Sequence, residues 1–147
     1  MFDLIYLLLL LFLGYGFGTY LEKKHYKRIK IDENELKNIV ILSKRDAKEI
    51  QLEGTKLLNG NVVISIDFFK KFVAGFINFF GGKIVVYETL LDRARREAII
   101  RVKKQAKNLG YNCLINLRLE TSSISKGTKG NVGSIEVLAY ATATKML

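Results

Sequence analysis

The chain has 147 residues, about half of them apolar, which is enough for one packed domain and an appendage. A single cysteine, Cys113, excludes an internal disulfide, and the absence of Pro argues against a Pro-rich linker. The net charge of +10 favours anionic partners such as lipid headgroups or nucleic acid.

The N-terminal segment predicts a transmembrane helix. Residues 4–21 read LIYLLLLLFLGYGFGTYL without a charged side chain, and a helix of that length spans about 27 Å, close to the ~30 Å hydrocarbon core of a bilayer. A basic segment follows this run. Because positive charge stays on the cytoplasmic side of a membrane, we expect the N-terminus outside the cell and the remaining domain in the cytoplasm. We therefore expect residues 1–30 to form a single-pass anchor in the inner membrane, with membrane contacts from Leu4, Leu8, Phe12, Leu21, Lys23, Lys24, Lys27 and Arg28.

Other interpretations of this segment stay open. Gly16 and Gly18 are spaced like a signal-peptide cleavage site, but the residues before the apolar run include no Lys or Arg. A buried core helix is a further alternative. Gly14 and Gly18 form a small-xxx-small pair that allows two helices to approach closely. His25 has no neighbouring ligand in the sequence, which favours a solvated side chain over a metal ligand or a pH switch.

The first half of the remaining chain predicts short strands. Residues 38–42 (NIVIL) and 61–66 (NVVISI) are rich in β-branched side chains, and residues 49–54 are a candidate short strand between them. Asn59-Gly60-Asn61 is typical of a turn.

A Phe-rich helix is expected after Asp67, which can cap it, and Gly81-Gly82 can end it. Its aromatic residues recur at helical spacing and predict a core or a subunit interface; insertion into lipid headgroups is the alternative. The residues expected at the interface are Phe68, Phe69, Phe72, Phe76, Phe79 and Phe80.

The strongest helical period runs from Tyr87 to Leu109, and Gly110 follows as a C-terminal stop. Its carboxylates, Glu88, Asp92 and Glu97, could act in acid–base chemistry only if they were buried together. Because basic residues surround them, the pattern favours a salt-bridged surface, with Glu97 and Arg101 as an i,i+4 pair.

Two strands are expected at the end of the chain, at residues 113–121 and 134–144. They predict a hairpin around a loop rich in Ser, Gly and Lys, which lacks the ending of a phosphate-binding loop. The whole pattern predicts an α+β domain over residues 31–147, with an antiparallel sheet, one long helix and one short helix, preceded by the transmembrane helix.

These residues carry a family resemblance. The segment from Asn61 to Thr144 resembles the YbjQ-type family, labelled "putative heavy-metal-binding". Its most telling parts are Ala74-Gly75, Phe80-Gly81-Gly82, Tyr87, Ala94/Glu97/Ala98, Leu109-Gly110-Tyr111-Asn112, Thr121-Ser122-Ser123 and Ala139-Tyr140. The resemblance implies a dodecin-like α+β fold assembled as a ring-shaped homo-oligomer, a pentamer, and it implies no catalytic residue. The chain departs from the family pattern in its apolar N-terminus, its basic charge and Tyr111, where the family usually has Ala.

The metal label fits the composition poorly. Soft metals need thiolate, imidazole or clustered carboxylates. Beyond Ile31 the chain offers one Cys, one Met and no His, so a metal site needs several copies of Cys113 brought together in a ring; a small core residue is the alternative.

The sequence thus predicts a non-enzymatic, membrane-tethered oligomeric scaffold without a cofactor. Its expected partners are further copies of itself and anionic lipid. Nucleic acid is not expected, because the aromatic residues needed to stack on bases are placed in the Phe-rich helix. The alternative function is ligand or heavy-metal binding at subunit interfaces.

Overall fold

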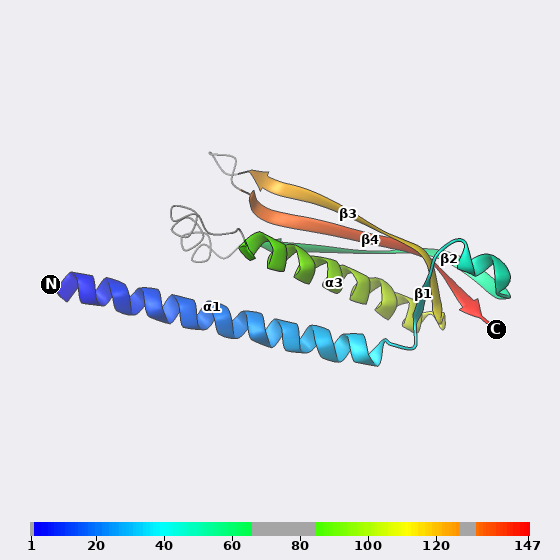
Figure 1. Ribbon diagram of the computed structural model, residues 1–147, viewed down its shortest axis with the longest axis horizontal. Helices are drawn as coiled ribbons and strands as arrows, with labels where there is room; N and C mark the ends of the chain where they lie inside the picture. The colour runs from blue at the N-terminus through cyan, green and yellow to red at the C-terminus, as the bar shows by residue number, and fades with distance from the viewer. Residues whose placement is uncertain (1, 66–84, 127–131) are drawn as a thin grey trace.

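The computed structural model describes residues 2–65, 85–126 and 132–147. In chain order the elements are α1 (Phe2–Glu35), β1 (Val40–Leu42), the 3-10 helix η1 (Asp46–Glu49), β2 (Leu52–Ser65), α3 (Val85–Asn108), β3 (Cys113–Lys126) and β4 (Val132–Met146). Figure 1 shows a sheet with α3 on one face and α1 outside α3. The α+β class therefore stands. The Phe-rich helix falls in residues 66–84, outside the described residues.

The sheet is mixed, whereas an antiparallel sheet was expected. Its strand order is β1-β3-β4-β2, and β4 is antiparallel to both of its neighbours. The short β1 is parallel to β3, with Val40 opposite Cys113. Strands β2 and β3 thus run in the same direction with β4 between them, because the chain crosses back along α3 before it enters β3. The predicted antiparallel pairing of the last two strands is confirmed.

Strand β2 is one continuous strand where two strands and a turn were expected. Gly60 lies in its middle and is paired with Ala139 of β4. A Cβ at Gly60 would lie 2.9 Å from the Ala98 carbonyl oxygen and 2.9 Å from Arg101 Cβ. The glycine is thus needed for the close approach of α3 to the strand and does not form a turn.

Helix α3 has the extent that the sequence predicts, within two residues at each end. It ends at Asn108, and Gly110 follows with a left-handed φ of 79°, while the Tyr111 amide donates to the Ala106 carbonyl at 2.9 Å. Small side chains line its buried face, which allows the helix to lie close to the sheet. The buried residues of that face are Leu90, Ala94, Ala98, Val102 and Ala106, and they pack on Leu58 and Val62 of β2 and on alternate residues of β4.

Strand β3 contains a bulge that changes which side chains face the core. Its register shifts between Ile115 and Arg118, and Asn116 has a φ of 56°. Leu114 is fully buried, and beyond the bulge Leu117 and Leu119 pack against the core. Leu114 and Leu117, three positions apart, thus both contact the core, which the period of two of a regular strand would not allow.

Helix α1 runs without interruption through the predicted anchor, its basic flank and the acidic segment up to Glu35. In the part of the chain that the structure describes, no helix is both long and apolar enough to cross a membrane. This finding contradicts the predicted transmembrane helix and the single-pass inner-membrane location with an outside N-terminus. A membrane anchor would separate from the domain after its basic segment. In the structure the second half of α1, which includes that segment, packs along α3 instead.

Candidate functional site

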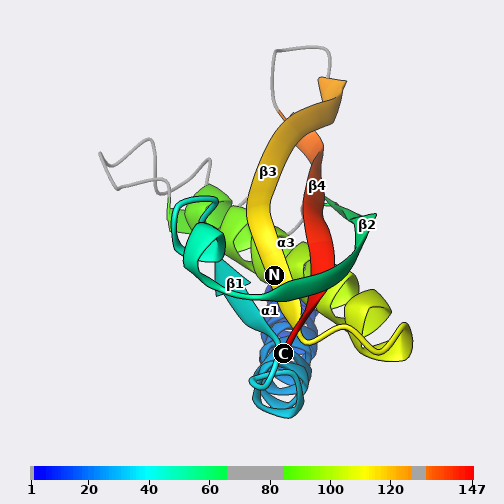
Figure 2. The same cartoon turned by 90° about the vertical axis from the view of Figure 1, so that its right-hand side faces the viewer.

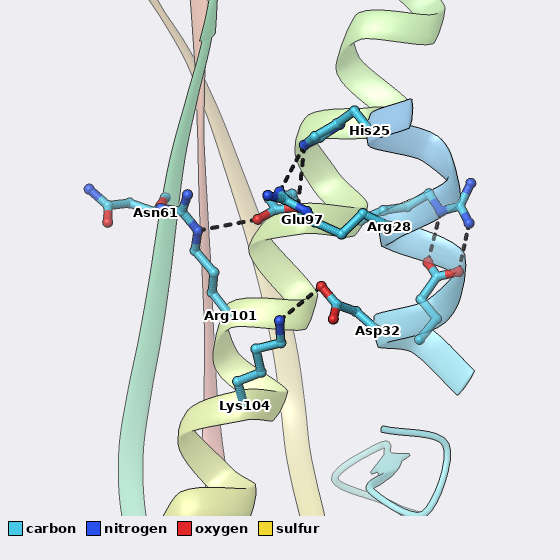
Figure 3. Close-up of polar contacts among 9 residues, drawn as sticks. His25, Arg28, Asp32, Asn61, Glu97, Arg101 and Lys104 are labelled. Atoms are coloured by element: carbon cyan, nitrogen blue, oxygen red, sulfur yellow. Dashed lines mark hydrogen bonds and ion pairs between the residues drawn. The ribbon is translucent and has the colours of Figure 1, made fainter. Parts of the chain in front are cut away.

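The second half of α1 is fastened to α3 by apolar and charged contacts. Ile29 and Leu36 are almost completely buried between the helix and the domain. Around them, side chains of opposite charge from the two helices meet in pairs, as Figure 3 shows. We call these contacts the α1–α3 seam. It joins residues that lie more than 60 positions apart in the sequence.

Glu97 of α3 lies at the centre of the seam. Its side chain is only 10% exposed, and Arg28 of α1 donates to its Oε2 at 3.1 Å. His25 Nε2 lies 3.6 Å from the same oxygen, and Arg101 Nε lies 3.7 Å from Oε1. The expected pair of Glu97 and Arg101 is thus present, but two groups from α1 join it.

His25 is held neutral in this environment. Arg28 Nη2 lies 3.0 Å from His25 Nε2, and because a guanidinium can only donate, Nε2 must accept. The proton then resides on Nδ1, which is buried without a hydrogen-bond partner among the described residues. Burial, followed by the charges of Arg28 and Arg93, lowers the pKa of His25 below 6.5, against the weaker opposing effect of Glu97.

A second group of ion pairs continues the seam toward the end of α1. Arg96 of α3 donates to both carboxylate oxygens of Glu33, at 2.8 and 2.6 Å. This bidentate hydrogen bond lowers the pKa of Glu33 and raises that of Arg96. Lys104 donates to Asp32 at 2.8 Å, and the Tyr26 hydroxyl donates to the Thr89 carbonyl at 3.0 Å.

The seam is built to hold α1 in place. Each carboxylate in it already contacts a cationic side chain of the facing helix, and Glu97 also contacts Arg101 of its own helix. Removing such a carboxylate would leave partly exposed cationic side chains without their partner and would loosen the contact between the two helices. The interpretation of Glu88, Asp92 and Glu97 as one buried acid–base set is not supported, because Glu88 is exposed and the Asp92 side chain is 60% exposed.

Several residues expected to contact a membrane lie on the outer side of α1. Phe12 is 80% exposed and Leu21 58% exposed, whereas the side chains of Leu4 and Leu8 lie outside what the structure describes. Lys23, Lys24 and Lys27 are exposed, and Arg28 reaches back to Glu97. Binding of anionic lipid by these lysines stays a prediction.

The described residues do not form a metal site within one chain. Among them, no group of three or more His, Cys, Asp or Glu side chains is arranged to hold a metal ion. Cys113 is fully buried at the start of β3, and burial raises the pKa of its thiol, which disfavours the thiolate that binds soft metals. Assembly of several Cys113 side chains into a shared site would require this residue to leave the core.

A groove runs along the edge of the sheet, where β2 has no neighbouring strand in the described sheet. The groove has a volume of about 450 Å³ and lies between β2 and the end of α3. Leu57, Leu58 and Leu109 give it an apolar surface, and Lys56, Asn59, Gln105 and Asn108 bring an ammonium and three amides. Sequence reasoning missed this groove, because the predicted turn at residues 59–61 divided the strand that forms it.

Side chains of α3 fix the edge strand beside this groove. Gln105 Nε2 donates to the Asn59 carbonyl at 2.7 Å, and Arg101 Nη1 donates to the Asn61 carbonyl at 2.5 Å. Alternate carbonyls of a strand point to the same side, so both bonds occupy the same edge of β2. These hydrogen bonds occupy backbone carbonyls that could otherwise pair with a strand of another chain, so they protect the edge from nonspecific association.

The opposite face of the sheet has no covering element in the described structure. Figures 1 and 2 show both helices on one side of the sheet. On the other side lie Val63, 53% exposed, and Leu57, 70% exposed, which at the open edge of the sheet also borders the groove. Asn61, between them, points away from α3 in Figure 3. This uncovered face therefore presents apolar side chains from the edge strand.

Comparison with known proteins places this fold in a family. The family model described as "Putative heavy-metal-binding", YbjQ_1, matches residues 39–147. The chain belongs to this family. The match begins well before Asn61, where the sequence resemblance was expected to start, and it excludes α1.

Relatives support the assignment. The chain is 39% identical over 90 residues to a "UPF0145 protein" of Hahella chejuensis, covering 61% of this chain and 81% of that one. It is 33% identical over 97 residues to a UPF0145 protein of Clostridium novyi, covering 66% and 88%. A solved protein of unknown function from the DUF74 family of Pediococcus pentosaceus is similar with 18% identity and a TM-score of 0.44, covering 64% of this chain and 87% of that one.

Proposed function

We propose that this protein binds a small organic anion in the groove along β2, and that a neighbouring subunit of a homo-oligomer closes the site. The observation that carries the proposal is the groove itself. Its volume of about 450 Å³ lies within the range of roughly 300–1,000 Å³ that is usual for small-molecule sites.

The chemistry of the lining selects the class of ligand. Leucine side chains can bury an apolar body, and the Lys56 ammonium can pair with a negative charge at one end. The amides of Gln105 and Asn108 can add hydrogen bonds. The described lining contains no thiol, imidazole or carboxylate, so the groove suits an organic anion better than a thiophilic metal.

Assembly is the second part of the proposal. The groove is open to solvent, and the uncovered sheet face beside it exposes Leu57 and Val63. A second subunit packed there would bury these apolar side chains and close the groove. Interface patches with an apolar centre and polar surroundings are the usual pattern for such contacts. The number of subunits, expected to be five, is part of the proposal.

Binding can be tested with a fluorescent organic anion, 8-anilinonaphthalene-1-sulfonate, titrated into the full chain. We expect saturable binding that Lys56→Glu and Leu57→Asp each weaken at least tenfold. Lys107→Glu is the matched control, because Lys107 is an exposed lysine near the end of α3 outside the groove lining. Equal binding by all four proteins would refute the groove as the site.

Binding of heavy metals, the property named in the family description, is tested with the same purified protein. Zn²⁺ and Cd²⁺ are titrated into the protein by calorimetry, with Cys113→Ala as a control. The proposal expects no stoichiometric uptake of either ion. Uptake that Cys113→Ala abolishes would replace the organic anion with a thiolate-bound metal.

A further inference from the structure

The first half of α1 exposes an unusual amount of apolar surface. Among the described side chains, nine large apolar ones between Ile5 and Leu21 are at least half exposed, and Phe12 reaches 80%. Figure 1 shows that this half of the helix extends beyond the start of α3. The described domain therefore leaves these side chains without cover.

These side chains share one side of the helix. At about 100° per residue, the nine positions fall within one half of the helix circumference. Ile29 and Leu36, the residues of α1 that are buried in the domain, fall on the opposite half. We call the exposed half, from Ile5 to Leu21, the outer apolar face. Further along the same side of the helix the surface becomes basic, because four exposed lysines lie there: Lys23, Lys24, Lys27 and Lys30.

The size of the outer apolar face indicates a protein interface. A large apolar side chain has roughly 150–250 Å² of surface, so the nine side chains expose on the order of 1,000 Å². The largest apolar patch of a typical monomer is about 300–600 Å². A stable interface buries about 800 Å² on each partner. The face exceeds what a monomer usually exposes and is sufficient for a dimer contact.

We infer that the outer apolar face packs against the same face of a second copy of this chain, with the two helices antiparallel. In a parallel pair, the exposed lysines of one α1 would lie against those of the other. In an antiparallel pair, the two basic segments lie at opposite ends, about 27 Å apart, well beyond the screening length of about 8–10 Å. Such a contact is closed and two-fold, so each α1 pairs with one other α1 only.

Gly16 gives the contact a point of close approach. It lies within the outer apolar face, and a Cβ placed on it would meet nothing within 4 Å. Bare backbone at this position allows the facing helix to come near, as small residues do at helix contacts generally. By the same angular count, Gly14 and Gly18 lie on the side that faces the domain, so the small-xxx-small pair itself is not part of the contact.

This contact is separate from the groove site. The family match begins at residue 39, so α1 is an addition to the domain that its relatives share. The proposed groove lies between β2 and the end of α3. Pairing through α1 would therefore double whatever assembly the domain forms.

The test measures the particle mass of the full chain by light scattering and compares two matched variants. Leu13→Glu places a charge in the outer apolar face. Ile31→Glu places the same charge about five turns further on the same line of the helix, beyond the apolar half. The two side chains are 50% and 52% exposed. We expect Leu13→Glu to halve the mass and Ile31→Glu to leave it unchanged.

Disulfide cross-linking tests the antiparallel arrangement. Leu13 lies near the middle of the overlap, so Leu13→Cys should form a cross-linked dimer under mild oxidation. Leu21→Cys should not, because its partner position lies at the far end of the second helix. Cys113 is buried and does not interfere. Equal cross-linking of both variants would indicate a parallel pair and overturn the proposal.

Two other results would also overturn it. One is a particle mass that is the same for Leu13→Glu and the wild type. The other is a flotation experiment in which the Leu13→Cys protein is recovered with phosphatidylcholine vesicles and mild oxidation forms no cross-linked dimer. That result would make lipid the occupant of this face. Neither result affects the groove, whose test depends on Lys56 and Leu57.

Discussion

Arg28 and Glu97 form an ion pair of 3.1 Å across two helices, although they lie 69 residues apart in the sequence. The pair connects the added helix α1 to the domain that the family shares. Because Glu97 is largely buried and also contacts Arg101 and His25, the central part of the seam depends on this carboxylate.

Replacement of Glu97 by Gln should therefore destabilise the protein. The substitution keeps the shape of the side chain but leaves the surrounding guanidinium groups without a counter-charge, which we expect to cost about 2 kcal/mol of unfolding free energy. Asp92→Asn is the control on the same helix; its side chain is 60% exposed, so the loss should stay below about 0.5 kcal/mol. Urea unfolding measures both, and equal losses would contradict the central role of Glu97.

Acidification should weaken the protein through His25. Its folded pKa lies below 6.5, so the unfolded chain binds a proton before the folded chain does, and the unfolding free energy falls as the pH drops below about 6.5. Arg28, Arg93 and Glu97 surround the ring, and His25 is the chain's one histidine. Urea unfolding at pH 7, 6 and 5 should show this loss in the wild type and a flatter dependence in His25→Gln. A wild type that gains stability on acidification over this range would be inconsistent with a neutral, partly buried His25.

Gly60→Ala should destabilise the contact between β2 and α3. The new methyl group would meet the Ala98 carbonyl and Arg101 Cβ at 2.9 Å, and overpacking of this kind typically costs about 1–3 kcal/mol. Asn61→Ala is the control on the next position, where the side chain is exposed, and it should change stability by less than about 0.5 kcal/mol. Thermal unfolding compares the two variants. Unchanged stability in Gly60→Ala would show that Gly60 is not needed for this contact.

The bulge in β3 can be tested at Asn116. With φ at 56°, this residue has a conformation that Gly adopts freely and a β-branched residue does not. We expect Asn116→Gly to be nearly neutral and Asn116→Val to cost about 1–3 kcal/mol in urea unfolding. The reverse order would mean that the strand is regular in solution.

Much of the fold could be predicted from local patterns. The period of small and apolar residues in α3 gave its extent, and Gly110 marked its end because a left-handed residue is needed there. The strands β3 and β4 showed their β-rich composition directly. These elements are specified by residues that are close in sequence, which is the range over which such patterns are informative.

Features that depend on distant contacts could not be predicted in this way. Gly60 has the local signature of a turn, but the approach of α3 from another part of the chain decides its role. His25 has no partner nearby in the sequence, and Glu97, which it approaches, belongs to α3. The apolar run of α1 correctly predicted a helix, but an apolar pattern does not show what covers it, and the inferred membrane span is contradicted.

The dependence of ligand binding on assembly tests the central claim most directly. The Leu13→Glu variant is used because it keeps the groove but removes the α1 contact. Native mass spectrometry gives the protein concentration below which its particles dissociate into single chains. Anilinonaphthalene sulfonate is then titrated above and below that concentration. We predict saturable binding to the assembled subunits and at least tenfold weaker binding to single chains. The same affinity in both states, or no binding in either, would contradict a groove that a neighbouring subunit completes.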